Sequence, residues 1–328
     1  MRNSKPGRLV QLAVAALVAL AISAGSVSAA KYAGDPFTLG AGARGLALGG
    51  AVVAGPFDGT SGYWNPAGMA RLDGRYVTAM HAETFGSLLN HDFLSYIDAR
   101  SKPNSKILAY GFYLYYLGGG GIKITQLNEF NRPYVVREES HADVLLAGSV
   151  AGRVWNKIDF GLTAKVIYRD IGTESGMGLT LDAGALYRPY QFLDLGLMIT
   201  DVTSGFIRYS GKTFGQGSHS ESIYPTVKPG FSVFKSYREF TGRLCASGDI
   251  KFENLKAASQ YWMGRISMDT HYGLEIDYRS LVFGRAGFDI GRFTTGGGVN
   301  FRNITLDFAY LHESELDDTY RVSAGYRF

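Results

Sequence analysis

The chain has 328 residues, a mean hydropathy of −0.03 and a formal net charge of +4. Three of its 33 basic residues lie in the first ten positions, which leaves 30 basic against 29 acidic residues, a balance that offers a nucleic-acid partner no electrostatic footprint. A single cysteine, Cys245, excludes an internal disulfide and a cysteine-cluster metal site.

Residues 1–30 have the pattern of a cleaved signal peptide. A basic start at Arg2, Lys5 and Arg8 is followed by an apolar stretch at 9–22 and by small residues at 27–30. A membrane anchor is the alternative, but the apolar stretch is short and no basic cluster follows it. We therefore expect the chain to be exported and its leader to be removed.

Residues 31–74 are rich in Gly and Ala and show no strand alternation. The motifs in this part are Gly40-Ala-Gly-Ala-Arg44, then Leu48-Gly-Gly-Ala51, and then Trp64-Asn-Pro-Ala-Gly68. The Asn-Pro step favours a turn, and small residues let one backbone pack closely against another. Gly40-x-Gly42-x-x-Gly45 also matches a dinucleotide fingerprint, but no hydrophobic strand precedes it and no βαβ unit surrounds it.

From residue 75 onward, apolar and polar residues alternate as they do in strands. Fourteen strands are predicted, near 75–81, 93–101, 106–117, 142–152, 158–169, 176–187, 193–200, 224–234, 240–250, 270–278, 281–288, 293–301, 304–312 and 319–328. If these strands form a barrel in a membrane, one set of charged residues would face its lumen, because a charge at mid-depth in lipid costs about 2–4 kcal/mol. The set is Lys165, Asp182, Glu275, Asp277, Asp307 and Arg321.

The loop lengths agree with this strand count. The long segments 118–140 and 201–223 both fall on one side of the predicted sheet, and short turns fall on the other side. Outer-membrane barrels have long extracellular loops and short periplasmic turns. We therefore expect both long segments to lie outside the cell.

The final strand, from Tyr320 to Phe328, alternates strictly. Tyr320, Val322, Ala324, Tyr326 and Phe328 share one face, and Arg321, Ser323, Gly325 and Arg327 share the other. An apolar, aromatic-ended face beside a polar face suits a wall with lipid outside and water inside. Resemblance to other outer-membrane barrels implies that Phe328 and Tyr326 form the signal read by the assembly machinery.

Composition favours a membrane β-barrel over a helical membrane protein. Beyond the leader, the longest uncharged stretch is 107–122, whose 16 residues fall short of a spanning helix, which needs about 20. The 43 Gly, 21 Tyr and 20 Phe suit tight strand packing and aromatic girdles. A soluble β-sandwich would also be rich in Gly and Tyr, but the leader and the final strand weigh against it.

The motifs of residues 31–74 resemble the N-terminal signature of the PorV/PorQ family, which is related to FadL-type outer-membrane transporters. The acidic pair of that family is reduced here to Asp58. The resemblance implies an all-β, fourteen-stranded FadL-like barrel at 75–328, with 31–74 folded inside it as a hatch. The hatch turn and its surroundings would be formed by Asn65, Pro66, Ala67, Gly68, Trp64 and Arg44. The alternative is that this segment only caps the barrel and touches no ligand.

Two functions stay open at this point. One is a FadL-like conduit for small hydrophobic molecules, and the other is a component of type IX secretion that binds protein partners through its outer loops. The loop residues that suit either role are Phe130, Tyr134, Phe206, Ile207 and Phe214. The chain lacks a G-x-S-x-G motif and its histidines lack metal-ligand spacing, so no enzyme activity, cofactor or metal site is predicted. The remaining expected partners are outer-membrane lipid and the assembly machinery.

Overall fold

The computed structural model describes residues 35–84, 88–100, 105–154, 157–211, 217–256, 258–313 and 317–328. Residues 1–34, which include the predicted signal peptide at 1–30, lie outside these ranges, and so does Phe214.

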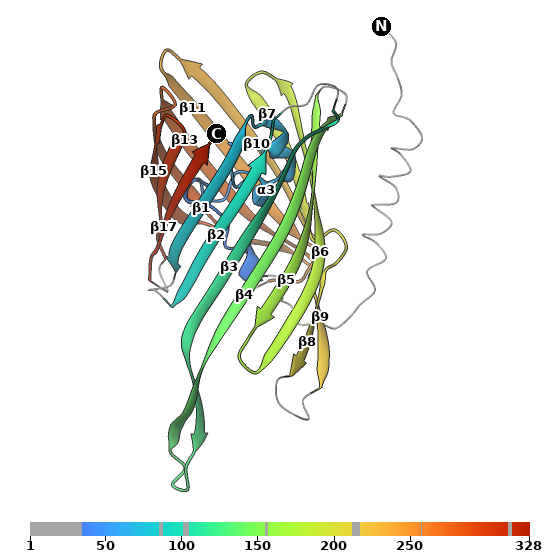
Figure 1. Ribbon diagram of the computed structural model, residues 1–328, viewed down its shortest axis with the longest axis vertical. Helices are drawn as coiled ribbons and strands as arrows, with labels where there is room; N and C mark the ends of the chain where they lie inside the picture. The colour runs from blue at the N-terminus through green and yellow to red at the C-terminus, as the bar shows by residue number, and fades with distance from the viewer. Residues whose placement is uncertain are drawn as a thin grey trace, which may run out of the picture.

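The described residues form a closed antiparallel barrel of fourteen strands (Figure 1), which confirms the predicted fold class. Its strands are β1 (Arg75–Thr84), β2 (Leu89–Asp98), β3 (Ile107–Leu127), β4 (Pro133–Val154), β5 (Ile158–Asp170), β6 (Glu174–Tyr190), β7 (Leu193–Thr200), β10 (Thr226–Tyr237), β11 (Phe240–Lys251), β13 (Ile266–Tyr278), β14 (Val282–Asp289), β15 (Arg292–Phe301), β16 (Ile304–Leu311) and β17 (Thr319–Arg327). The ring closes where β1 pairs with β17, from Tyr76 opposite Arg327 to Glu83 opposite Tyr320. Closure leaves no sheet edge along the wall.

Alternation divides the wall into an apolar outer face and a polar inner face. On β13, Tyr272, Leu274 and Ile276 are exposed, whereas Gly273 and Glu275 between them are buried. Of the predicted luminal charges, four are buried and two are half-buried. The buried ones are Lys165, Asp182, Glu275 and Arg321, and the half-buried ones are Asp277 and Asp307.

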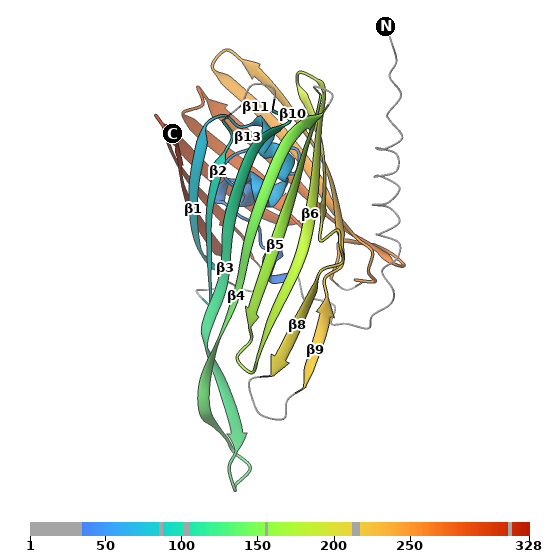
Figure 2. The same cartoon turned by 45° about the vertical axis from the view of Figure 1, so that its right-hand side comes forward.

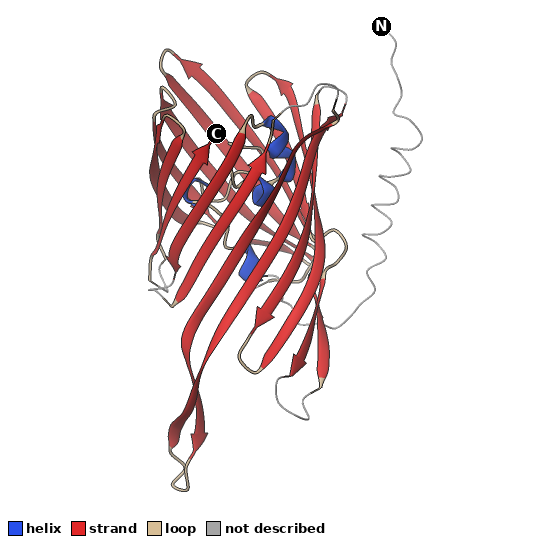
Figure 3. Ribbon diagram, viewed as in Figure 1, coloured by secondary structure: helices blue, strands red, loops and turns tan. Residues whose placement is uncertain are grey.

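Residues 35–74, here called the internal segment, lie inside the ring of strands (Figure 3). They contain four short helices, η1 (Asp35–Thr38), α2 (Ala43–Ala47), α3 (Ser61–Trp64) and η2 (Pro66–Arg71). No helix in the described part of the chain is long and apolar enough to cross a membrane.

The outer segment 118–140 is not the loop that the sequence suggested. β3 and β4 continue beyond the wall as a two-stranded ribbon, which turns at residues 128–132 (Figure 2). Its strands were predicted too short because both faces of the ribbon meet water, so the apolar alternation ends at the membrane surface. Segment 201–223 likewise holds two short strands, β8 (Phe206–Gly211) and β9 (Ser218–Ser222), and a third extra strand is β12 (Tyr261–Met263).

The division into two faces predicts the effect of a charge on the outer one. Leu274→Arg places a cation near the middle of β13 on the lipid side and should destabilise the barrel by about 2–4 kcal/mol. Urea unfolding in vesicles, followed by the heat-modifiable shift of the folded band, measures the change. Leu274→Met is the control and should leave the midpoint almost unchanged, and equal midpoints for Arg and Met would contradict the assigned face.

Candidate functional site

Two cavities lie on opposite sides of the internal segment. The outer cavity, of about 160 Å³, is bounded by the ends of β7 and β11 and by the loops beside them. The inner cavity, of about 230 Å³, lies near the short turns, beside the beginning of β1 and the end of β17. Phe37, Thr38, Tyr63 and Trp64 of the segment line the first cavity, and residues 42–44 and 57–60 line the second. The segment therefore separates two luminal spaces.

Aromatic side chains form one wall of the outer cavity. The Tyr63 ring stacks on Tyr115 and meets Tyr113 and Phe93 edge-on, with ring centres 6.0–6.3 Å apart. The Tyr63 hydroxyl donates to Phe37 O (2.8 Å) and accepts from Gly40 N (3.1 Å). Burial raises the pKa of Tyr63, so this phenol remains neutral. This wall offers flat apolar surface to a ligand.

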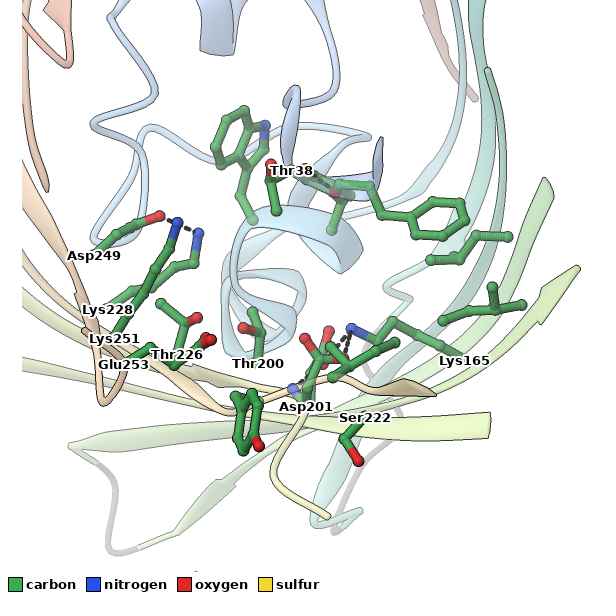
Figure 4. A pocket seen from close by; sticks show the side chains of 18 of the residues that line it. Thr38, Lys165, Thr200, Asp201, Ser222, Thr226, Lys228, Asp249, Lys251 and Glu253 are labelled. Atoms are coloured by element: carbon green, nitrogen blue, oxygen red, sulfur yellow. Dashed lines mark hydrogen bonds and ion pairs between the residues drawn. The ribbon is translucent and has the colours of Figure 1, made fainter. Parts of the chain in front are cut away.

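Ion pairs form the other walls of the outer cavity (Figure 4). Lys165 Nζ contacts Asp182 (2.6 Å) and Asp201 (2.7 Å) on one side. Lys228 Nζ contacts Asp249 (2.6 Å) on the opposite side. Each charge is balanced within the wall, as buried charges must be.

A chain of alternating charges ties the internal segment to the inner cavity. Arg44 donates to both carboxylate oxygens of Glu275 (2.9 and 2.7 Å), and Arg285 donates to Glu275 (2.7 Å) and to Asp307 (2.6 Å). Burial works against the Arg44 cation, but the carboxylates of Glu275, Asp58 and Asp307 outweigh it and raise the pKa of Arg44. Such bidentate, charge-assisted contacts fix orientation as well as position.

Asn65 and the two residues after it pack onto a patch of bare backbone. The Asn65 side chain is fully buried, donates to Val53 O (2.8 Å) and accepts from Ala67 N (3.1 Å). Gly161 and Gly184 face one another across β5 and β6 directly beneath it. A Cβ added at Gly184 would lie 2.1 Å from Asn65 Oδ1, and one at Gly161 would lie 2.3 Å from Ala67 N. Only glycine permits this approach.

Other side chains hold the segment around the rest of the wall. Arg71 pairs with Asp159 (2.6 Å) and Asp194 (2.5 Å). Further contacts, of which five of the shorter ones follow, each join one wall side chain to one backbone group of the segment. They are Ser323 with Ala43 N (2.7 Å), Ser95 with Gly59 O (2.7 Å), Tyr115 with Pro36 O (2.8 Å), His271 with Gly49 O (2.9 Å) and Arg321 with Leu39 O (3.0 Å).

The predicted outer-loop residues do not form one group. Phe130 is 81% exposed at the ribbon tip, and Tyr134 and Phe206 are also exposed. Ile207 is fully buried on β8 and packs in the cluster around Phe37, so it is not part of the exposed loop surface, and its role as a ligand or partner contact stays a prediction. Because β8 pairs with β6, alternate β8 side chains turn inward.

The residues predicted to form the hatch turn are mostly buried, and those predicted to form the assembly signal lie where β1 meets the end of the chain. Pro66, Ala67 and Gly68 are buried, whereas Trp64 is half-buried, lines the outer cavity and donates to Ala41 O (2.8 Å). Phe328 exchanges backbone hydrogen bonds with Arg75, and its ring stacks on Tyr326. An assembly role for Phe328 and Tyr326 stays a prediction.

Sequence reasoning missed several residues of the outer cavity. Lys228, Asp249 and Lys251 come from β10 and β11, and their only signal was a charged residue within a strand. Thr200 and Thr226, which oppose one another across β7 and β10, gave no signal at all.

Comparison with known proteins gives matches in structure only. No family model matches the sequence, and no curated protein sequence does. Among solved structures, the CymD monoaromatic hydrocarbon channel has a TM-score of 0.58 and 13% identity, over 88% of this chain and 98% of that one. The toluene transporter TodX of Pseudomonas putida gives 0.51 and 12%, over 87% and 96%. A FadL homologue of Pseudomonas aeruginosa gives 0.50 and 13%, over 84% and 95%. At these identities the similarity establishes a shared fold.

The glycine patch predicts which wall residue the Asn65 turn depends on. Gly184→Ala should displace the turn and destabilise the internal segment by about 1–3 kcal/mol, as overpacking does, while the strand pairing stays intact. Limited proteolysis of residues 35–74 in folded protein measures the loosening. Gly148→Ala is the control, because a Cβ there meets no atom within 4 Å. Equal cleavage of the two variants would show that the turn does not rest on Gly184.

Proposed function

We propose that this protein is an outer-membrane conduit for small hydrophobic molecules. A ligand would enter the outer cavity, pass the internal segment and leave through the inner cavity toward the periplasm. The observation that carries the proposal is the presence of two cavities on opposite sides of one segment inside a closed barrel. The two cavities can form one pathway only if the segment moves aside, so residues 31–74 would act as the hatch.

The hatch role is consistent with how the segment is held. The hydrogen bonds that join it to the wall, such as those of Ser323 and Ser95, involve side chains, whereas the wall is held by backbone hydrogen bonds between its own strands. A closed barrel satisfies its backbone internally. The segment could therefore shift locally, for example around Trp64 and Gly40, while the wall stays closed.

The shared fold supports the same function. The neighbours include a monoaromatic hydrocarbon channel and a toluene transporter, and none of the three compared proteins is described as an enzyme. By this analogy the protein would lie in the outer membrane, with lipid around its apolar outer face and a non-enzymatic role. Export through the predicted signal peptide and assembly through the Phe328 strand would deliver it there.

A second candidate function, binding of a protein partner, would use the ribbon of β3 and β4. The exposed apolar side chains Phe130, Tyr134 and Val136 lie on it, beside charged residues. The resemblance to PorV/PorQ proteins implies a partner from a secretion system. Removing residues 120–139 separates the two candidates, because a conduit would still transport and a docking protein would lose its partner.

Filling the outer cavity should block transport. Ile167 is buried and lines the outer cavity, whereas its neighbour Val166 faces outward on the same strand. Ile167→Trp should abolish the protein-dependent part of the initial uptake of radiolabelled toluene by cells that express the protein. Val166→Trp adds the same side chain on the lipid side and should leave that uptake intact.

Both variants are compared at equal outer-membrane levels, with heat-modifiable mobility as the check on folding. Unchanged uptake in a folded Ile167→Trp protein would remove the outer cavity from the pathway.

A further inference from the structure

We infer that the outer cavity selects neutral, single-ring molecules that carry a hydrogen-bonding group, such as phenols, over plain hydrocarbons of the same size. This inference rests on the proposed conduit function and names the substrate class that its entry site would accept. Three properties of the cavity carry it: its size, its unused hydroxyl groups and its balanced charges.

The size of the cavity suits one ring. Its volume of about 160 Å³ is close to the roughly 150 Å³ of an engineered cavity that holds benzene. Phe37, Tyr63 and Tyr113 supply aromatic surface on one side, and aromatic rings pack well against such surface in offset or edge-on geometry. A single ring therefore fills the space, whereas a long chain does not fit within it.

The opposite wall carries hydroxyl groups that the protein does not use. Thr200, Thr226 and Ser222 all line the cavity, and their hydroxyls have no hydrogen-bond partner among the residues that the structure describes. Figure 4 shows Thr200 and Thr226 between the two groups of ion pairs, and the two residues are opposed in the β7 and β10 pairing. Each hydroxyl can donate one hydrogen bond and accept others. A ligand hydroxyl would form hydrogen bonds with these side chains. A hydrocarbon would displace the water that hydrogen-bonds to them and offer no hydrogen bond in its place.

The charges of the cavity disfavour an ionic ligand. Lys165, Lys228 and Lys251 each have a carboxylate within 4.0 Å, so none of these three ammonium groups is left to pair with an anion. Asp182, Asp201 and Asp249 are engaged by the same lysines. An ionic ligand would have to break one of these pairs and leave a buried charge uncompensated, which is strongly unfavourable. A neutral polar ligand avoids that penalty.

The test compares 4-fluorophenol with fluorobenzene, which differ by one hydroxyl. Binding to the purified full-length protein in detergent is followed by ¹⁹F NMR titration. The Ile167→Trp protein, whose cavity is filled, is the reference: it gives the change in ¹⁹F signal that comes only from partition of the probe into detergent micelles. We expect 4-fluorophenol to bind about tenfold more tightly than fluorobenzene, which corresponds to about 1.4 kcal/mol.

Variants of the wall assign the preference to the hydroxyls. The double variant Thr200→Val with Thr226→Val keeps the shape of the wall and should lower the phenol preference severalfold, while fluorobenzene binds as before or better. Thr125→Val is the matched control, because Thr125 is exposed on the β3 part of the ribbon and lines neither cavity, and it should keep the full preference.

Each other outcome overturns the inference in a distinct way. If fluorobenzene binds as tightly as 4-fluorophenol, the conduit survives and its proposed selectivity does not. If neither probe binds more than it does to the Ile167→Trp protein, both the selectivity and the entry site fail. If the double variant keeps the phenol preference, or if Thr125→Val removes it, the polar contact lies elsewhere and the inference is wrong.

Discussion

The pairing of β1 with β17 closes the sheet, and the placement of the charged side chains that line the lumen depends on that closure. A closed wall satisfies its own backbone groups, so its outer face needs only apolar side chains to lie in lipid. Its inner face is thereby screened from lipid and can carry Lys165, Glu275 and Arg285 in paired form. An open sheet of the same sequence would expose those charges to the hydrocarbon or leave an edge unpaired.

The second constraint is that a backbone segment buried in the lumen must find partners for its polar groups. Wall side chains supply them at Ala43, Gly49 and Gly59, among other positions. Where no side chain intervenes, the wall is reduced to glycine so that the two backbones can touch, as at Gly184 beneath Asn65. The segment is therefore held by hydrogen bonds from wall side chains and by close backbone contact, and both depend on which wall residue faces inward.

Sequence patterns predicted the features that recur with a period of two. All fourteen wall strands and the inward direction of Lys165 and Asp182 follow from alternation, because lipid and lumen impose opposite chemistry on neighbouring residues. The ribbon beyond Gly118 was missed, since water on both faces imposes no such pattern. The outer cavity was missed as a site because its residues converge from β5, β7, β10 and β11. Closure of the ring brings them together, and no local spacing encodes it.

The ribbon of β3 and β4 leaves the wall at an irregular point. The β3 to β4 register shifts between Gly119 and Ile122, and a side chain at Gly120 or Gly121 would meet no neighbour within 4 Å. Beyond this bulge, no third strand in the described part of the chain pairs with the ribbon. A lone two-stranded ribbon is marginally stable in water, so its hydrogen bonds open without disturbing the barrel. Amide protons at the ribbon tip would therefore exchange with solvent faster than those of the wall, and the bulge would act as the pivot about which the ribbon moves relative to the barrel.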